Sequence, residues 1–271
     1  MKQVDLHHGA ATDVGRVRKV NEDSFLVAPP VFVVADGMGG HSGGDVASQI
    51  VVEEFHRLAE TYDPSRGAED VSDAFARAQA RIRAYGDAHR ALNPGWHAGT
   101  TAVVAVLVDD AGVPKWLLAN LGDSRIYRIT EGRLEQVSVD HSVVQELIDA
   151  GEITPDQAAV HPERHVITRA LGSPEGIAPD FFLLPLPSVE RLLLCSDGVT
   201  GMIEDKEIED ILETVADPRD AADRLVRAAV EAGGRDNATA IVVDVVGLVH
   251  DASYDSLRQQ ESLESKLGGR Q

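Results

Sequence analysis

The apolar residues of this chain follow two kinds of pattern, which alternate in blocks. Short β-branched runs predict buried strands at residues 24–28 and 31–35, and apolar residues three and four apart predict amphipathic helices at 44–60 and about 71–85. Later segments predict strands at 101–108, 115–121, 124–129, 133–138, 191–195 and 240–246, and helices at 207–215 and 220–232. Blocks of strands followed by pairs of helices favour an α+β fold with antiparallel sheet, because a parallel sheet would need strict alternation of strand and helix.

The same patterns predict one large domain over residues 1–246 and a polar tail over 247–271. Residues 143–169 interrupt the strands with a helical segment and a loop that carries prolines. The tail has only scattered leucines, which bury too little apolar surface to order it. We therefore expect it to lie outside the core, as a loose helix or a disordered segment.

Composition and charge narrow the class of function. The 271 residues carry a formal net charge of −20. Nucleic acids and anionic membranes are bound mainly through clustered Lys and Arg, so neither is an expected partner. No apolar run approaches the roughly 20 residues that cross a bilayer, and residues 1–9 are too polar for a signal peptide, so we expect a cytoplasmic protein. The single cysteine, Cys195, excludes an internal disulfide.

Acidic residues recur where the predicted strands end. Asp36 and Asp197 closely follow apolar strands, Asp123 lies between two strands, and Asp236 precedes the last one. Three of the four adjoin a glycine, which lets a backbone carbonyl or a ligand approach closely. Oxygen ligands of this kind suit Mg²⁺ and Mn²⁺, and two such ions about 3.5 to 4 Å apart can hold a phosphoryl group and activate water. Bound cations would also reverse the local charge, which otherwise repels a phosphorylated substrate.

Two observations bear on this metal hypothesis. A single Asp-Gly pair is most often only a turn, so the hypothesis depends on several acidic positions occurring together. Zinc sites of the usual kinds are not expected, because the ten histidines form no HExxH motif and one cysteine allows no CxxC motif.

Six short motifs give a more specific indication. They are RKVNED at 18–23, VVADGMGG at 33–40, GTT at 99–101, GDSR at 122–125, SDG at 196–198 and DN at 236–237. Together with DHS at 140–142 and TRALG at 168–172, their order resembles the metal-dependent protein serine/threonine phosphatases, the PPM or type-2C family, and most closely its bacterial branch. The likeness covers about residues 5–246. It implies a four-layer α-β-β-α sandwich, in which two central antiparallel sheets are flanked by helix pairs, with a mobile flap at about 141–172 beside the active site.

The resemblance also implies a binuclear Mn²⁺ or Mg²⁺ centre at one edge of the sandwich. In the family pattern Asp36 would bridge the two metals, the carbonyl of Gly37 would bind one of them, and Asp197 and Asp236 would complete the other. Glu22 would act through coordinated water. Direct attack by a metal-activated water would then hydrolyse phosphoserine and phosphothreonine without a phosphoenzyme.

Three further positions refine this expectation. Asp123, together with Asp197, would hold a third, weaker metal ion of the kind that bacterial relatives often bind. Arg18 matches the phosphate-binding arginine of the family, whose planar guanidinium can hold two phosphate oxygens at once. We therefore expect Arg18, Asp36 and Asp197 to be catalytic. Met38 departs from the pattern, since many eukaryotic relatives have a histidine there that is a proposed general acid, so the group that protonates the leaving alcohol is unassigned.

The expected partners are phosphorylated proteins, including the Ser/Thr kinases that such an enzyme would oppose, and the chain is expected to be a monomer. Two other interpretations stay open. A phosphoprotein-binding pseudophosphatase would be expected to lack one or more metal-site carboxylates, and here all of the matching ones are present. A serine hydrolase is the weaker alternative: residues 40–44 satisfy the G-x-S-x-G pattern with Ser42 as nucleophile, and Asp197 and His250 follow in a permissible order. The predicted strand ends before Gly37, however, whereas a nucleophile elbow turns directly off its strand.

Overall fold

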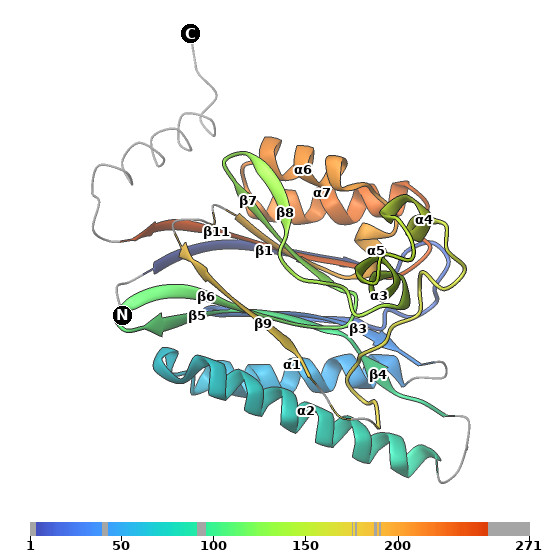
Figure 1. Ribbon diagram of the computed structural model, residues 1–271. Coiled ribbons are helices and arrows are strands. Elements are labelled where there is room, and N and C mark those ends of the chain that lie inside the picture. The colour runs from blue at the N-terminus through green and yellow to red at the C-terminus, as the bar shows by residue number, and fades with distance from the viewer. Residues whose placement is uncertain are drawn as a thin grey trace.

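The computed structural model describes residues 4–39, 43–90, 96–174, 176, 178–186, 189 and 191–248 (Figure 1). Its first sheet has five strands in the order β1, β11, β10, β7, β8. These strands are β1 (Val4–Asp13), β11 (Ala238–Leu248), β10 (Arg191–Cys195), β7 (Arg125–Thr130) and β8 (Arg133–Gln136). Each neighbouring pair is antiparallel, as predicted.

The second sheet has six strands, in the order β2, β3, β5, β6, β9, with β4 also paired to β3. Its strands are β2 (Asp23–Ala28), β3 (Val31–Met38), β4 (Gly99–Thr100), β5 (Ala102–Asp110), β6 (Val113–Leu121) and β9 (Asp180–Pro185). All of these pairs are antiparallel as well.

Helix pairs cover the outer faces of the two sheets (Figure 1). The second sheet is covered by α1 (Gly44–Glu60) and α2 (Gly67–Arg90), with the short η1 (Pro64–Arg66) between them. The first sheet is covered by α6 (Asp205–Thr214) and α7 (Pro218–Glu231), and the one-turn helix α5 (Asp197–Thr200) follows β10. The layers are therefore helix, sheet, sheet and helix, which confirms the predicted α+β sandwich.

Strand β5 shows why the central strands appear in the sequence as continuous apolar runs. Its buried residues alternate between two cores. Val104 and Val106 belong to the core beneath α1 and α2, whereas Val103 and Leu107 belong to the core between the two sheets. A third core joins the helices α5, α6 and α7 to the first sheet. Because both faces of a central strand are covered, apolar residues are required at successive positions.

Two strands at sheet edges were not predicted. In β1 the polar residues Asp5 and His7 alternate with apolar ones that pack on the core between the sheets, and in the sequence the polar residues conceal this alternation. Strand β9 follows Pro179 and ends at Pro185, and prolines usually mark the limits of a strand. Both strands lie at an edge, where one side of the backbone needs no partner.

The strand that carries Asp36 is longer than predicted. It continues through Gly37 to Met38, because these two residues pair with Thr100 and Gly99 of β4. The expectation that this strand ends before Gly37 was therefore wrong. The predicted strand ended too early because glycine has a low strand propensity, so its presence does not indicate that the backbone there is paired in a sheet.

The predicted helical segment after the strands forms two short helices, α3 (Val143–Asp149) and α4 (Pro155–Ala159). They belong to residues 141–172, hereafter the flap, which lie beside α5 at one end of the sandwich (Figure 1). Isolated β-bridges pair Ser142 with Ile167 and Thr100 with Leu171. The second bridge attaches the end of the flap to the second sheet.

Several predictions fall on residues outside the described ranges. These are the tail from residue 249 onward, the nucleophile candidate Ser42 and its possible base His250. None of the helices in the described ranges combines the length and the apolar character that a bilayer crossing requires.

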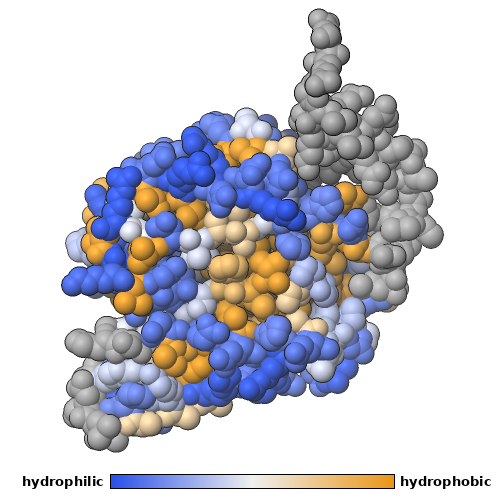
Figure 2. All heavy atoms as spheres, turned by 180° about the vertical axis from the view of Figure 1, so that it is seen from behind, coloured by the Kyte–Doolittle hydropathy of each residue, from blue (hydrophilic) through white to orange (hydrophobic). Residues whose placement is uncertain are grey.

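Apolar and hydrophilic residues occupy separate regions on the rear face of the molecule. Figure 2 shows a band of apolar residues across its middle, with hydrophilic residues above and below. The band runs between the two helix layers, where the edges of the sheets reach the surface. Edge strands of both sheets carry apolar side chains that are only partly buried, among them Leu6 of β1 and Phe25 of β2.

Candidate active site

Five aspartates gather at one end of the sandwich. Asp23 begins β2 and pairs with Asp36 near the end of β3. Asp123 lies in the turn between β6 and β7, Asp197 begins α5 directly after β10, and Asp236 precedes β11. Antiparallel neighbours place the end of one strand beside the start of the next, so these positions meet at the same edge of the two sheets.

The backbone of Asp36 is held by the Gly-Thr-Thr motif. Its N–H donates to Thr101 Oγ1 over 3.1 Å, and its carbonyl accepts bonds from Thr100 Oγ1 at 2.8 Å and from the Thr101 N–H at 2.9 Å. The Thr101 hydroxyl also lies 2.7 Å from Ser124 Oγ. The motif thus fixes the strand position from which the Asp36 carboxyl projects.

Gly37 is packed so closely that only glycine fits. A β-carbon there would lie 2.3 Å from the carbonyl oxygen of Gly44 and 2.5 Å from that of Glu22. The Gly37 N–H donates to the Glu22 carbonyl over 3.2 Å, and Ser48 Oγ donates to the same oxygen over 2.6 Å. Glu22, the end of β3 and the start of α1 are therefore in direct backbone contact.

A second close contact positions Asp197. A β-carbon on the next residue, Gly198, would lie 1.8 Å from the carbonyl oxygen of Asn237. The glycine of the Ser-Asp-Gly motif is required because the backbone of the Asp-Asn motif passes directly over it. Asp197 and Asp236 are consequently held next to each other although they are 39 positions apart in the chain.

The side chain of Asn237 joins three segments of the site. Its Nδ2 donates to the carbonyls of Val14 and Val20 over 3.0 Å each, and its Oδ1 accepts the N–H of Glu22 at 2.8 Å. Val14 and Val20 flank the loop that carries Arg18. This loop and the Glu22 backbone are thus fixed to the start of β11.

Arg18 brings a cation to the edge of the carboxylates. Its Nη2 donates to Asp236 Oδ2 over 2.7 Å, and its side chain is 49% exposed. Burial lowers the pKa of Arg18, but the hydrogen bond and the charges of Asp236, Glu22 and Asp36 outweigh burial and raise it. The guanidinium therefore stays charged between the acidic cluster and solvent, where it can bind an anion.

Burial and mutual repulsion act against ionisation of the central carboxyls. The pKa of Asp36 is raised well above its usual range, first by burial and then by the charges of Asp23, Asp197 and Asp123. Burial also raises the pKa of Asp197. A hydrogen bond with Asp36 lowers this pKa, and the charge of Asp236 raises it further. Buried carboxylates of like charge are unfavourable unless cations compensate them.

Two oxygens of the cluster, Asp23 Oδ1 and Asp123 Oδ1, are buried and have no hydrogen-bond partner among the described residues. Burial, followed by the charge of neighbouring aspartates, raises the pKa of each carboxyl to about 7. The other oxygen of Asp23 accepts bonds from Ser196 Oγ at 2.8 Å and Thr239 Oγ1 at 2.7 Å. Buried acceptors without a protein partner are rare in folded proteins, and these two oxygens fit the bonding requirements of a metal ion or of water.

The structure places every predicted site residue at this end of the sandwich. They are Arg18, Glu22, Asp36, Gly37, Asp123, Asp197 and Asp236. Asp23 was not predicted as a site residue. The only signal in the sequence is that Asp23 directly follows another acidic residue, Glu22. The pairing of Asp23 with Asp36 in the strand register shows that Asp23 faces the cluster.

The chemistry of the cluster fits Mg²⁺ or Mn²⁺. In the parts of the chain that the structure describes, no group of three or more His, Cys, Asp or Glu side chains is arranged to hold one ion. A closed cage is not what these ions need, because Mg²⁺ usually keeps several waters and binds through one or two carboxylates. Buried carboxylates and unpaired carboxyl oxygens supply the hard oxygen ligands that such hydrated ions prefer.

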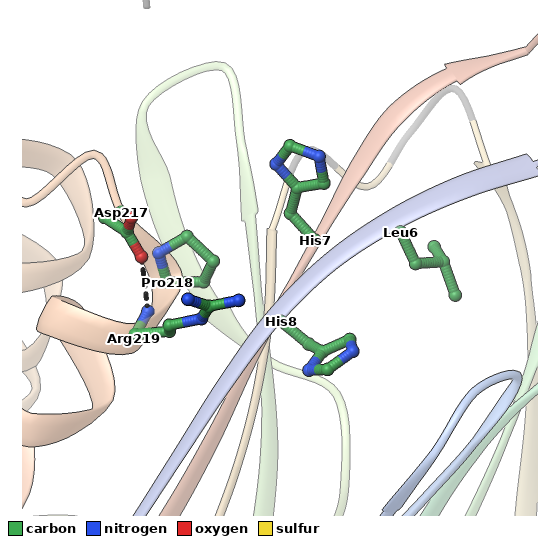
Figure 3. Close-up of a pocket in the computed structure, with 6 residues that line it drawn as sticks. All are labelled: Leu6, His7, His8, Asp217, Pro218 and Arg219. Atoms are coloured by element: carbon green, nitrogen blue, oxygen red, sulfur yellow. Dashed lines mark hydrogen bonds between the residues drawn. The ribbon is translucent and has the colours of Figure 1, made fainter. Parts of the chain in front are cut away.

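A separate pocket of about 220 Å³ lies between β1 and the start of α7. Figure 3 shows Arg219 extending toward β1, from which His7 and His8 point in opposite directions. Asp217 accepts the backbone N–H of Arg219 at 2.9 Å, and burial followed by the Arg219 charge lowers the pKa of His8. The pocket contains none of the predicted site residues, so it is not part of the candidate active site.

Comparison with known proteins identifies the family. The family model for protein phosphatase 2C matches residues 16–232. The chain belongs to the protein phosphatase 2C family. It is 36% identical over 248 residues to the serine/threonine phosphatase stp of Listeria welshimeri, a match that covers 88% of this chain and 96% of the relative.

Solved structures of protein phosphatase 2C relatives share the fold. The crystal structure of serine/threonine phosphatase Stp1 from Staphylococcus aureus has a TM-score of 0.80 and 31% identity, and the match covers 90% of this chain and 96% of that one. The catalytic domain of the serine/threonine protein phosphatase PstP, solved in complex with two manganese ions, has a TM-score of 0.78 and 32% identity over 90% of this chain and 100% of that one. The predicted family, enzyme class and sandwich fold are confirmed.

Proposed function

We propose that this protein phosphatase 2C chain hydrolyses phosphoserine and phosphothreonine in proteins at a binuclear Mn²⁺ or Mg²⁺ centre. The observation that carries the proposal is the buried carboxylate cluster around Asp36 and Asp197, with Arg18 at its solvent side. The relative named a serine/threonine phosphatase and the PstP structure with two manganese ions support it.

The proposed metal ligands supply carboxylate and carbonyl oxygens: Asp36, Gly37, Asp197 and Asp236, with Glu22 acting through water. Asp123, together with Asp197, would hold a third and weaker ion. When bound, the metal ions offset the charge of the phosphoryl group and lower the pKa of a water that attacks phosphorus.

The protein's own residues bind and orient the substrate. A guanidinium has five N–H donors, so Arg18 can keep its bond to Asp236 and still hold oxygens of the transferring phosphoryl group. Its positive charge then offsets the negative charge that the phosphoryl oxygens carry in the transition state. The close backbone contacts at Gly37 and Gly198 fix the carboxylates before substrate binds, so little reorganisation is needed during the reaction.

Position 38 supplies no proton to the leaving alcohol. Met38 is the last residue of β3, next to the cluster, and its thioether has no acidic hydrogen. The departing serine or threonine oxygen must therefore take its proton from water or from a group elsewhere at the site.

Two alternative functions were considered. A pseudophosphatase would bind phosphoproteins without turnover, but the carboxylates that match the family pattern are all present. Strand β3 reaches Met38, so strand length does not distinguish the serine hydrolase from the phosphatase. Membership of the protein phosphatase 2C family now argues against that alternative.

We further propose that the enzyme acts in the cytoplasm as a monomer and that phosphorylated Ser/Thr kinases are among its substrates. The high negative charge supports protein substrates over nucleic acid or anionic membrane partners.

Assays with and without metal test the proposed function. Purified protein is assayed with p-nitrophenyl phosphate and with one peptide phosphorylated on serine or threonine, in Mn²⁺, in excess EDTA and with fluoride. We expect turnover of both substrates with Mn²⁺ and its loss in EDTA. Absence of turnover with every divalent metal would contradict the proposal in favour of a pseudophosphatase, and turnover that persists in EDTA would contradict it in favour of a serine hydrolase.

A further inference from the structure

His141 joins the turn that carries Asp123 to the base of the flap. Its side chain is 0% exposed. Ring atom Nδ1 accepts the N–H of Gly122 at 3.1 Å, and the His141 N–H donates to the Gly122 carbonyl over 2.9 Å. Both polar backbone groups of the residue next to Asp123 are thus bonded to one histidine.

The same histidine, which is the first residue of the flap, is also connected to the flap's other end. Its Nε2 lies 3.2 Å from Asp180 Oδ2 at the start of β9, and Asp180 Oδ1 accepts a bond from Arg169 Nη1 at 3.1 Å. The carbonyl of His141 accepts the N–H of Thr168 at 2.8 Å. Thr168 and Arg169 lie near the end of the flap. The main chain of His141 therefore bonds this end directly, and its ring is connected to it through Asp180.

The two ring contacts require one tautomer. The Gly122 N–H is a donor, so Nδ1 must be the acceptor and the ring proton must be on Nε2, from which it donates to Asp180. The hydrogen-bond network therefore defines a directed connection from the 122–123 turn through the ring to Asp180. An alanine at position 141 can make neither contact.

A shift of the 122–123 turn would be transmitted to the metal cluster. Gly122 has φ of +116° and packs on Thr101, whose Cγ2 would lie 2.5 Å from a β-carbon at residue 122. Thr101 in turn bonds the backbone of Asp36. The Asp123 carboxyl that follows Gly122 is buried with one unpaired oxygen, so small movements of the turn change where that oxygen points.

We propose that His141 is a positioning residue of the phosphatase, whose ring sets both the 122–123 turn and the base of the flap. Metal binding at Asp123 and phosphopeptide binding beneath the flap then depend on the same side chain. This inference rests on the proposed function, because it assigns a role at the same site.

Four variants separate the two contacts of the ring. His141→Ala removes both ring contacts. Asp180→Ala leaves the Gly122 contact in place and removes the ring contact with Asp180 together with the bond from Arg169, and Asp180→Asn keeps an oxygen for the Nε2–H. Tyr62→Phe is the matched control, because it removes a part-buried hydrogen bond, from the Tyr62 hydroxyl to the Leu107 carbonyl at 2.8 Å, in a region remote from the carboxylates. Each variant is characterised by melting temperature, by titration calorimetry with Mn²⁺ and by steady-state kinetics.

We expect His141→Ala to weaken the weakest Mn²⁺ binding step and to raise the KM for a phosphopeptide, each about tenfold, which corresponds to the loss of one buried hydrogen bond. Asp180→Ala should raise the phosphopeptide KM by a similar factor and leave Mn²⁺ affinity unchanged, since the Gly122 contact remains. Asp180→Asn should recover most of that loss. Tyr62→Phe should lower only the melting temperature.

The proposal is overturned if His141→Ala lowers only the melting temperature, as the control does, or if Asp180→Ala leaves the phosphopeptide KM unchanged. Should His141→Ala fail to fold, the two Asp180 variants decide, because Asp180 is a partly exposed residue. Failure of the proposed function has a different signature, since the wild-type protein would then not hydrolyse the phosphopeptide. In that case equal Mn²⁺ affinity of wild type and His141→Ala overturns the inference by itself.

Discussion

At the scale of single residues, the role of Arg18 distinguishes a structural ion pair from a substrate-binding group. In the structure it bonds Asp236 over 2.7 Å and is about half exposed. An exposed ion pair contributes about 0–1 kcal/mol to stability, and its loss has no reason to affect turnover. A guanidinium that holds the transferring phosphoryl group contributes instead to transition-state binding.

Substitution of Arg18 should therefore affect catalysis more than stability. Lysine keeps the charge but not the planar fork, so we expect Arg18→Lys to lower kcat/KM for a phosphopeptide about tenfold and Arg18→Ala about a hundredfold. Steady-state kinetics at saturating Mn²⁺ measure this, with Arg57→Lys on the exposed side of α1 as control. Unchanged kcat/KM in Arg18→Ala would show that the residue is only a surface ion pair.

Among the helices and strands, the spacing of apolar residues predicted the elements whose faces pack against a core. The helix predicted at 44–60 is observed as Gly44–Glu60, and the strand predicted at 191–195 is observed as Arg191–Cys195. The edge strands β1 and β9 were not predicted, because an exposed edge tolerates polar residues and prolines that conceal the strand pattern.

The residues of the candidate site that stand within short sequence motifs could be predicted from the sequence. Asp36, Asp197 and Asp236 stand within such motifs, and the structure brings them to one end of the sandwich. Asp23 and His141 were not assigned roles, because their roles depend on contacts across the fold. Asp23 faces the cluster through the strand register, and His141 reaches Gly122 across 19 residues of sequence.

The packing of α1 on α2 depends on one buried carboxylate. Glu54 has a side-chain exposure of 0% and accepts bonds from Arg57, Arg77 and Arg81 at 2.9, 3.0 and 2.7 Å. The three arginines keep access to solvent, so we expect Glu54→Ala to lower the free energy of unfolding by about 2 kcal/mol and to leave kcat of the folded protein unchanged. Urea denaturation measures the loss. Glu60→Ala, at an exposed position of the same helix, should change stability by less than about 0.5 kcal/mol, and an equal loss in both variants would contradict this account.

At the scale of the whole molecule, the carboxylate cluster makes stability depend on pH. The folded-state pKa values of Asp23 and Asp123 are raised to about 7, above those of an unfolded chain. The stability linked to these groups is present at pH values below their unfolded pKa of about 4 and is lost as pH rises through about 7. The net charge of −20 adds repulsion in the same direction. The melting temperature of metal-free protein should therefore fall between about pH 5 and pH 8.

Bound cations should reverse this trend. Mn²⁺ should raise the melting temperature most at pH 8 and least at pH 5, because protons compete for the same carboxylates. Thermal melts in EDTA and in Mn²⁺ across this pH range measure both effects. Asp23→Asn should flatten the pH dependence in EDTA, whereas Asp73→Asn at an exposed position of α2 should not. A melting temperature in EDTA that rises from pH 5 to pH 8 would contradict the pKa assignments.

The proposed hydrolysis requires that the buried aspartates hold the metal ions. The most direct test is to measure bound Mn²⁺ per chain and p-nitrophenyl phosphate turnover together in wild type, Asp36→Asn and the control Asp73→Asn. We expect two tightly bound ions and turnover in wild type and control. Asp36→Asn should stay folded in EDTA, because a neutral amide replaces a buried carboxyl whose ionised form is unfavourable there. It should nevertheless lose bound Mn²⁺ and at least about 1,000-fold in turnover. An Asp36→Asn protein with wild-type Mn²⁺ content and full turnover would contradict the account.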